Sequence, residues 1–331
     1  MRSLILLCAA IALAVGAIAR TPAAQTSPEV REACRSDKAT IPAARLPETV
    51  RLATCPVGER VITDHGIGTI LPAPGQSIYV DSLTTEGSQE LQVTHFRDGT
   101  VELKYVGNES GEAQSEEIGT ASSPGECSDG TYNALDRKVY ANLRWYFNPR
   151  TVPQELARKG AVKAIRRGTA NITGVQDRCG VRDRVKWGMS YEGSTRATAQ
   201  VTANNDCVAN DGKTVVSFGT LPENTMAFTC TVWVPTPGPN NDRVKWSDIM
   251  INKAHRNWTT RPGSPNCRGR YDLESTITHE RGHTFGLGHV SESSHRNLTM
   301  SDRSNGPCQS SERSLGRGDA KGLNSKYKKR R

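Results

Sequence analysis

The segment from His279 to His289, His-Glu-Arg-Gly-His-Thr-Phe-Gly-Leu-Gly-His, constrains the fold of this 331-residue chain more than any other stretch. His279 and His283 are four residues apart, so on a helix their side chains project from one face, about one turn apart. Gly286 can adopt a positive φ and end that helix, which would turn the chain and return His289 toward the same point. The spacing therefore predicts a helix that ends at a glycine turn beside a cluster of three imidazoles.

Three imidazoles with this spacing can bind one zinc ion with Zn–N distances of about 2.0–2.1 Å. They leave a fourth position for water, whose pKa the ion lowers to about 7. Glu280 lies between the first two histidines, beside that open position, where a carboxylate can act as a general base. The alternative is a polar helix with solvated histidines, but the motif fixes five residues within eleven, which favours the metal site.

This segment resembles the signature of the metzincin zinc endopeptidases. Met300, eleven residues after His289, fits the methionine that metzincins place beneath the zinc. The chain is most similar to the matrixin branch, over roughly residues 140–322, where Tyr271-Asp272-Leu273 resembles the entry to the active-site helix. The resemblance implies zinc ligands His279, His283 and His289, Glu280 as general base, and hydrolysis of peptide bonds in proteins or peptides.

The predicted fold class is α+β, with a metzincin-like catalytic domain built on a twisted mixed sheet. It would contain two main helices and the active-site helix. A first helix is expected from Pro153 to about Ala170, and the active-site helix from its N-cap Asp272 to Gly286. The strand around Asp248 is expected to be an edge strand that binds an extended substrate by β-augmentation.

Residues 1–19 have the features of a signal peptide: Arg2, an apolar run, and Ala17-Ile18-Ala19 as a cleavage site. No later stretch is apolar enough to span a bilayer, and mean hydropathy is −0.56. We therefore expect a secreted protein without stable membrane insertion. Removal of the signal peptide would also remove Cys8, which leaves an even number of cysteines, eight, as is typical of a disulfide-bonded exported chain.

Charge divides the chain. Residues 1–130 carry 10 Lys and Arg against 17 Asp and Glu, whereas residues 131–331 carry 33 against 17. The predicted organisation follows this division. It comprises a β-rich pro-region or accessory segment at 20–106, a flexible acidic linker at 107–130, the zinc peptidase domain at 131–322 and a basic tail at 323–331. No residue of the β-rich segment makes a convincing site, and His95 is expected at the surface.

Arg178-Cys179-Gly180-Val181 resembles the matrixin cysteine switch, in which a thiolate of the pro-segment blocks the zinc. The matrixin motif precedes the first catalytic strand, whereas this one follows the first helix, and the even cysteine count favours a disulfide. Cys127, Cys207 and Cys230 are the candidate partners of Cys179. Cys267 and Cys308 flank the zinc motif and are expected to pair with each other.

One catalytic zinc ion is the expected cofactor. Calcium could bind near surface Asp residues, but no D-x-D-x-D-G loop assigns it, and no second zinc site is assigned. We expect a monomer with no specific nucleic-acid partner, in which the basic tail is solvated. Two alternatives remain open: an exported binding or adhesion module whose zinc is structural, and an enzyme acting on a non-protein amide.

Overall fold

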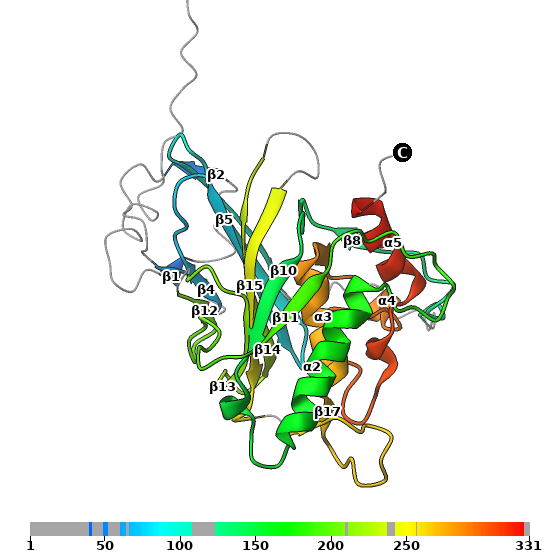
Figure 1. Cartoon of the computed structure of the whole chain (residues 1–331). Coiled ribbons are helices and arrows are strands. Elements are labelled where there is room, and N and C mark those ends of the chain that lie inside the picture. The colour runs from blue at the N-terminus through cyan, green and yellow to red at the C-terminus, as the bar shows by residue number, and fades with distance from the viewer. Residues whose placement is uncertain are drawn as a thin grey trace, which may run out of the picture.

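The computed structural model describes residues 40–41, 49–51, 60–63, 66–107, 123–208, 211–236, 242–255 and 257–327. In this part of the chain, a ten-stranded mixed sheet forms the centre, with helices on one side and a four-stranded sheet on the other (Figure 1). A large mixed sheet with few helices agrees with the expected α+β class. The predicted signal peptide, Cys34 and Cys55 lie outside the described residues. None of the described helices is long and apolar enough to cross a membrane.

The large sheet has the strand order β11-β10-β13-β15-β14-β5-β6-β7-β2, and β9 pairs with β15. Pairing is parallel among β11, β10, β13, β15 and β9, and antiparallel from β15 through β14 to β2. Its strands are β2 (Thr49–Arg51), β5 (Gln76–Thr84), β6 (Ser88–His95), β7 (Thr100–Gly107), β9 (Arg137–Lys138), β10 (Leu143–Phe147), β11 (Met189–Ser194), β13 (Val215–Gly219), β14 (Thr225–Val234) and β15 (Asp242–Asn252).

Three smaller sheets complete the described strands. The four-stranded sheet consists of β1 (Thr40–Ile41), β3 (Arg60–Thr63), β4 (Gly68–Ile70) and β12 (Asp206–Cys207). The two-stranded sheets pair β16 (Trp258–Thr259) with β17 (Tyr271–Asp272), and β18 (Leu287–Gly288) with β8 (Asn133–Ala134).

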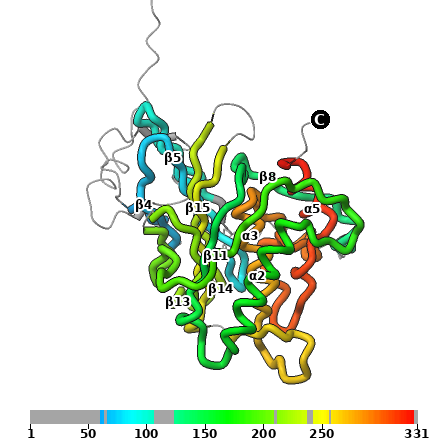
Figure 2. The backbone as a smooth tube through the Cα atoms, viewed as in Figure 1, coloured from blue at the N-terminus to red at the C-terminus, as the bar shows by residue number. Residues whose placement is uncertain are grey.

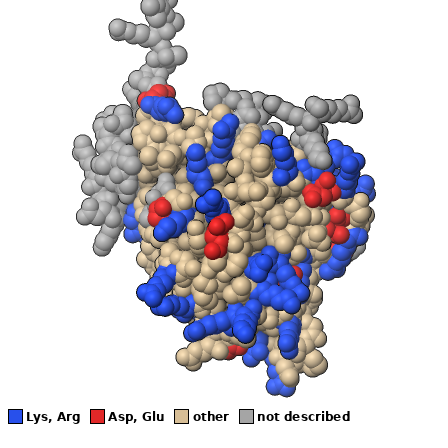
Figure 3. All heavy atoms as spheres, in the orientation of Figure 1, with Lys and Arg blue, Asp and Glu red and all other residues tan. Residues whose placement is uncertain are grey.

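The helices are α2 (Arg158–Thr173), α3 (Leu273–Thr284), α4 (Glu292–His295) and α5 (Arg317–Lys326), with 3-10 turns at Pro149–Thr151 and Ser311–Arg313. Helix α2 begins later than predicted. Pro153 starts a single turn that the Leu156 N–H closes, and Ala157 is extended, so the first helical hydrogen bond is the one that the Ala161 N–H donates to the Ala157 carbonyl. The buried face of α2, which includes Ala161 and Ile165, packs toward α3, and its exposed face carries Lys and Arg (Figure 3).

The N-terminal strands continue the large sheet. Strand β5 lies between β14 and β6, and Figure 2 shows the N-terminal strands beside the yellow-green β14 and β15. Ile78 and Val80 pack with Phe228 and Val232 on the face covered by the four-stranded sheet. Because successive strand residues alternate, Tyr79 points to the helical side. The β-rich segment therefore shares its hydrophobic cores with the predicted peptidase domain.

Several expectations about individual segments need correction. Strand β15, which carries Asp248, is not an edge strand, because β13 and β14 pair along its two sides. His95 is buried, with its Nδ1 2.8 Å from the Pro72 carbonyl oxygen, and is not a surface residue. The predicted basic tail also begins later than residue 323, because α5 extends to Lys326 and Tyr327 is buried.

Three disulfide bonds join cysteines within the described residues: Cys127–Cys179, Cys207–Cys230 and Cys267–Cys308. The Cys267–Cys308 prediction is confirmed, and Cys179 pairs with one of its three candidate partners. Cys127 belongs to the predicted linker, of which Gly107, the last residue of β7, and residues 123–130 are described. The disulfide attaches this end of the linker to the loop after α2. Disulfides are typical of an oxidising, extracellular environment.

Candidate metal centre

Helix α3 begins as the sequence predicts. Asp272 is its N-cap, and its carboxylate accepts hydrogen bonds from the Ser275 N–H at 3.0 Å and the Ser275 hydroxyl at 2.8 Å. Arg313 donates to both carboxylate oxygens of Asp272 at 2.6 Å, which fixes the start of the helix. His279 and His283 then project from the same face of α3, one turn apart.

The helix ends at the predicted glycine turn. Gly286 has φ +86°, and a Cβ at this position would lie 2.2 Å from the Arg137 carbonyl oxygen, so a side chain is excluded on both conformational and steric grounds. After the turn, β18 pairs with β8 and leads the chain back to His289. The turn thus returns a third imidazole to the two on α3.

The Nε2 atoms of the three histidines converge. The distances are 3.0 Å between His279 and His289, 3.1 Å between His283 and His289, and 3.2 Å between His279 and His283. Ligands at about 2.0–2.1 Å from a tetrahedral zinc ion are separated by about 3.3 Å. The three nitrogens therefore have nearly the spacing of three corners of a zinc site.

Each imidazole is oriented by an oxygen atom near its Nδ1. His279 Nδ1 lies 2.8 Å from the Thr299 carbonyl oxygen, and His283 Nδ1 lies 2.9 Å from that of Leu287. His289 Nδ1 lies 2.5 Å from the Glu90 carboxylate. Donation from Nδ1 to such oxygens leaves the Nε2 lone pairs directed at a common point, as in protein zinc sites.

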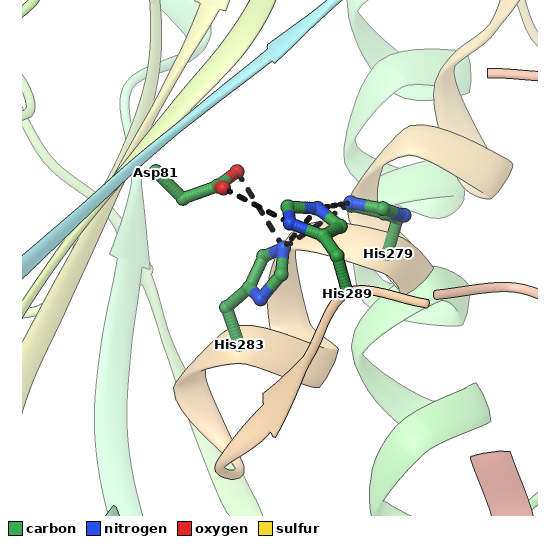
Figure 4. A group of neighbouring side chains, drawn as sticks. All are labelled: Asp81, His279, His283 and His289. Atoms are coloured by element: carbon green, nitrogen blue, oxygen red, sulfur yellow. Dashed lines mark hydrogen bonds and ion pairs between the residues drawn. The ribbon is translucent and has the colours of Figure 1, made fainter. Parts of the chain in front are cut away.

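Asp81, on β5, is a fourth potential ligand that the sequence analysis did not identify. One carboxylate oxygen lies 3.5 Å from His283 Nε2 and the other 3.6 Å from His289 Nδ1 (Figure 4). Neither oxygen has a hydrogen-bond partner among the described residues, although the side chain is fully buried. The sequence did contain a signal for Asp81, because this acidic residue directly follows the apolar residues Ile78-Tyr79-Val80 of a predicted strand. A carboxylate buried in such a strand needs a partner, which a metal ion can supply.

These groups form a donor set that suits a metal ion. One ligand atom from each of Asp81, His279, His283 and His289 lies within 4.8 Å of every other. Three imidazole nitrogens and one carboxylate oxygen are ligands that zinc accepts in tetrahedral geometry. A bound cation would also satisfy the two Asp81 oxygens, which otherwise make no hydrogen bond. The residues therefore fit a zinc ion.

Electrostatics within the cluster follow from its burial. Burial and the neighbouring His289 lower the pKa of His279 to about 3, and burial likewise lowers the pKa of His283 well below its usual range. Burial, followed by the nearby Glu280 and Glu90 carboxyls, raises the pKa of Asp81 well above its usual value. Neutral imidazole is the form that binds metal, and a cation would favour the Asp81 carboxylate.

Glu280 is fully buried on α3, and one of its oxygens accepts a hydrogen bond from the Thr229 hydroxyl on β14. Its other oxygen, Oε1, has no partner among the described residues. Burial raises the pKa of Glu280 to about 8 despite the hydrogen bond from Thr229 and the charge of Arg281. A bound cation would favour the ionised form, in which the carboxylate is held at one oxygen by Thr229 and can accept a proton at the other.

Met300 packs against the helix that carries His279 and His283, in the turn that also orients His279. Its side chain is buried against Gly282 on α3, where a Cβ would lie 2.3 Å from the Met300 Sδ. The buried Asp319 carboxylate accepts hydrogen bonds from the Thr299 N–H at 2.8 Å and the Met300 N–H at 3.2 Å. Helix α5 thereby fixes the turn whose Thr299 carbonyl contacts His279.

The structure brings together the predicted residues His279, Glu280, His283, His289 and Met300, and it adds Asp81 and Glu90 from the N-terminal segment. No protein-family model matches the chain, and no curated protein matches it either. The functional argument therefore depends on the geometry of this centre.

Proposed function

We propose that the chain is a secreted zinc-dependent endopeptidase of metzincin type. His279, His283 and His289 would hold the ion, and Met300 would form the apolar floor beneath them. The observation that carries the proposal is the convergence of three Nε2 atoms within 3.0–3.2 Å of one another beside the buried Glu280. A carboxyl group next to three imidazoles is the combination required for hydrolysis by an activated water.

Zinc at this site would act as a Lewis acid that polarises the scissile carbonyl and lowers the pKa of the attacking water. Glu280 is the general base. Its Oε1, which has no hydrogen-bond partner among the described residues, takes the proton of the water and then delivers it to the leaving amine. Thr229 holds the second oxygen and thereby orients the carboxyl group during both transfers.

The test compares variants of the protein made in the Asp81→Ala background, in which no fourth protein ligand can close the site. Glu280→Gln preserves side-chain volume and the acceptor oxygen for Thr229, so it should retain zinc and fold but lose hydrolysis of an unstructured protein substrate. Glu280→Ala should behave in the same way, whereas His283→Ala should lose both zinc and activity. Near-normal hydrolysis by Glu280→Gln would contradict the proposed mechanism. Zinc content is measured by mass spectrometry and folding by circular dichroism.

One observation favours the alternative of a binding module with a structural zinc ion. Asp81 would complete four protein ligands, and structural zinc sites are closed in this way. A structural site has no use for a free Glu280 carboxyl, so under this alternative no form of the chain would hydrolyse peptides and Glu280→Gln would change only stability.

A further inference from the structure

We propose that the intact chain is latent, because the hairpin of β5 and β6, residues 76–95, closes the metal centre. Asp81 fills the fourth ligand position, and β5 covers the strand with which an extended substrate would pair. This inference rests on the proposed function, since it concerns access to the same centre. It assigns an inhibitory role to a segment in which the sequence indicated no site.

Asp81 is positioned as a ligand and not as a residue of an ordinary ion pair. Its side chain is fully buried, and neither oxygen has a hydrogen-bond partner among the described residues. Both oxygens face the imidazoles of His283 and His289, at 3.5 and 3.6 Å (Figure 4). A catalytic zinc site keeps one position open for water, whereas four protein ligands close it. With Asp81 coordinated, the attacking water has no position.

Strand β5 also blocks the sheet next to the centre. In the register between the two strands, Asp81 lies opposite Thr229 of β14, whose hydroxyl holds Glu280. An extended peptide adds to a sheet through the free main-chain groups of an edge strand. Strand β14 has β15 on one side and β5 on the other, so it offers no free edge while β5 is in place.

Apolar contacts on the same face of β5 fix this register. Tyr79, two residues before Asp81, is buried with the Arg137 guanidinium 3.8 Å from its ring centroid. Leu83, two residues after Asp81, is buried in the core that includes Ile277 of α3. A slip of one residue would turn all three side chains to the opposite face, so these contacts keep Asp81 directed at the histidines.

The second strand of the hairpin acts on the third histidine. Glu90 of β6 lies opposite Asp81 in the register of the hairpin and is 2.5 Å from His289 Nδ1. The hairpin thus supplies a ligand and also orients a ligand. Cys179, which resembles a cysteine switch, is bonded to Cys127 and has no thiol for this purpose. A carboxylate takes the blocking position instead.

The first experiment tests the ligand position in the full chain loaded with cobalt, whose visible absorption reports its ligands. Azide is the probe for an open position. Asp81→Ala should bind azide at least about tenfold more tightly than wild type, and should bind cobalt about 10–100-fold more weakly. Asp98→Asn, which makes the same charge change in the β6–β7 turn, is the matched control and should behave as wild type. Equal azide affinity in wild type and Asp81→Ala would overturn the proposal.

The second experiment tests whether β5, by pairing with β14, prevents an extended substrate from pairing with that strand. Leu83→Ala removes apolar contacts that hold β5, so in the Asp81→Ala background it should speed hydrolysis of an unstructured substrate several-fold. An unchanged rate would overturn the strand-cover part of the proposal. Wild type that hydrolyses this substrate as fast as the double variant would overturn latency while leaving the proposed function intact. The two proposals can fail separately. If Glu280→Gln proves as active as its parent, the proposed function is overturned. If azide still binds only to Asp81→Ala, the proposal that Asp81 closes the fourth ligand position stands.

Discussion

Gly282→Ala tests how closely the metal-binding helix packs on the methionine turn. A Cβ at residue 282 would lie 2.3 Å from Met300 Sδ and 2.9 Å from its Cε. Met300 is 2% exposed and surrounded by a packed core, so its side chain has little room to move away. Movement of the turn would also displace the Thr299 carbonyl, which lies 2.8 Å from His279 Nδ1.

The expected effect of Gly282→Ala on the free energy of unfolding has opposite signs in wild type and in the Met300→Ala variant. Replacing an interior helical glycine with alanine stabilises a helix by about 0.8–1.0 kcal/mol. Overpacking a core costs about 1–3 kcal/mol, so in wild type Gly282→Ala should lower the free energy of unfolding by about 0–2 kcal/mol. Met300→Ala removes the obstructing atoms. In that background Gly282→Ala should stabilise by about 1 kcal/mol, giving a coupling energy of about 1–3 kcal/mol.

Urea denaturation of wild type, both single variants and the double variant gives the four free energies of the cycle. Zinc affinity, measured by competition with a chelator, should fall in Gly282→Ala because the His279 support moves. If Gly282→Ala stabilised wild type and Met300→Ala by the same amount, the helix would not contact the methionine and the proposed floor would be wrong.

Three further predictions concern the support of α3 and its surroundings. Arg313→Ala should lower the free energy of unfolding by about 2–3 kcal/mol in urea denaturation. The substitution leaves the buried Asp272 without its ion-pair partner. Because the Arg313 side chain is 25% exposed, the loss of stability should be smaller than for a fully buried ion pair. Burial raises the pKa of Glu312 to about 8 from a usual 4.5, so wild type should lose stability as pH rises between these values. Glu312→Gln should remove this carboxyl's share of that loss, with a melting temperature that coincides with wild type at pH 4 and exceeds it at pH 8. Replacing Cys267 and Cys308 with serine should cost about 3–4 kcal/mol in urea denaturation, because their disulfide links residues 41 apart in sequence.

The local part of the centre could be predicted because its signals lie within a short segment. Asp272 as N-cap, the four-residue spacing of His279 and His283, and the positive φ of Gly286 depend on neighbouring residues. These features specify a helix, a turn and the return of His289 without knowledge of the rest of the fold. The Cys267–Cys308 pair followed from its position on either side of this segment.

The strand that carries Asp248 was misassigned because strand order depends on distant pairing. Four of the six residues from Trp246 to Ile251 are apolar, and they occupy both faces of the strand, which is typical of a strand covered on both faces and was compatible with an interior position. The tail was assigned from its charge, yet Lys326 reaches the Leu135 carbonyl and the Tyr327 hydroxyl donates to the Phe285 carbonyl at 3.0 Å. A long polar side chain can be buried when its tip finds such a partner.

Asp81 and Glu90 could not be assigned because their role exists only after β5 pairs with β14, across about 150 residues of sequence. Their burial has a thermodynamic consequence. The carboxyl groups of Asp81, Glu90 and Glu280 lie close enough that the charges of Glu280 and Glu90 both raise the pKa of Asp81. Docking the hairpin therefore places the Asp81 carboxyl near two further acidic groups in a site from which water is excluded, which disfavours its ionised form when no metal ion is bound. Because zinc would be coordinated more strongly with the hairpin docked than without it, metal binding and closure of the centre stabilise each other.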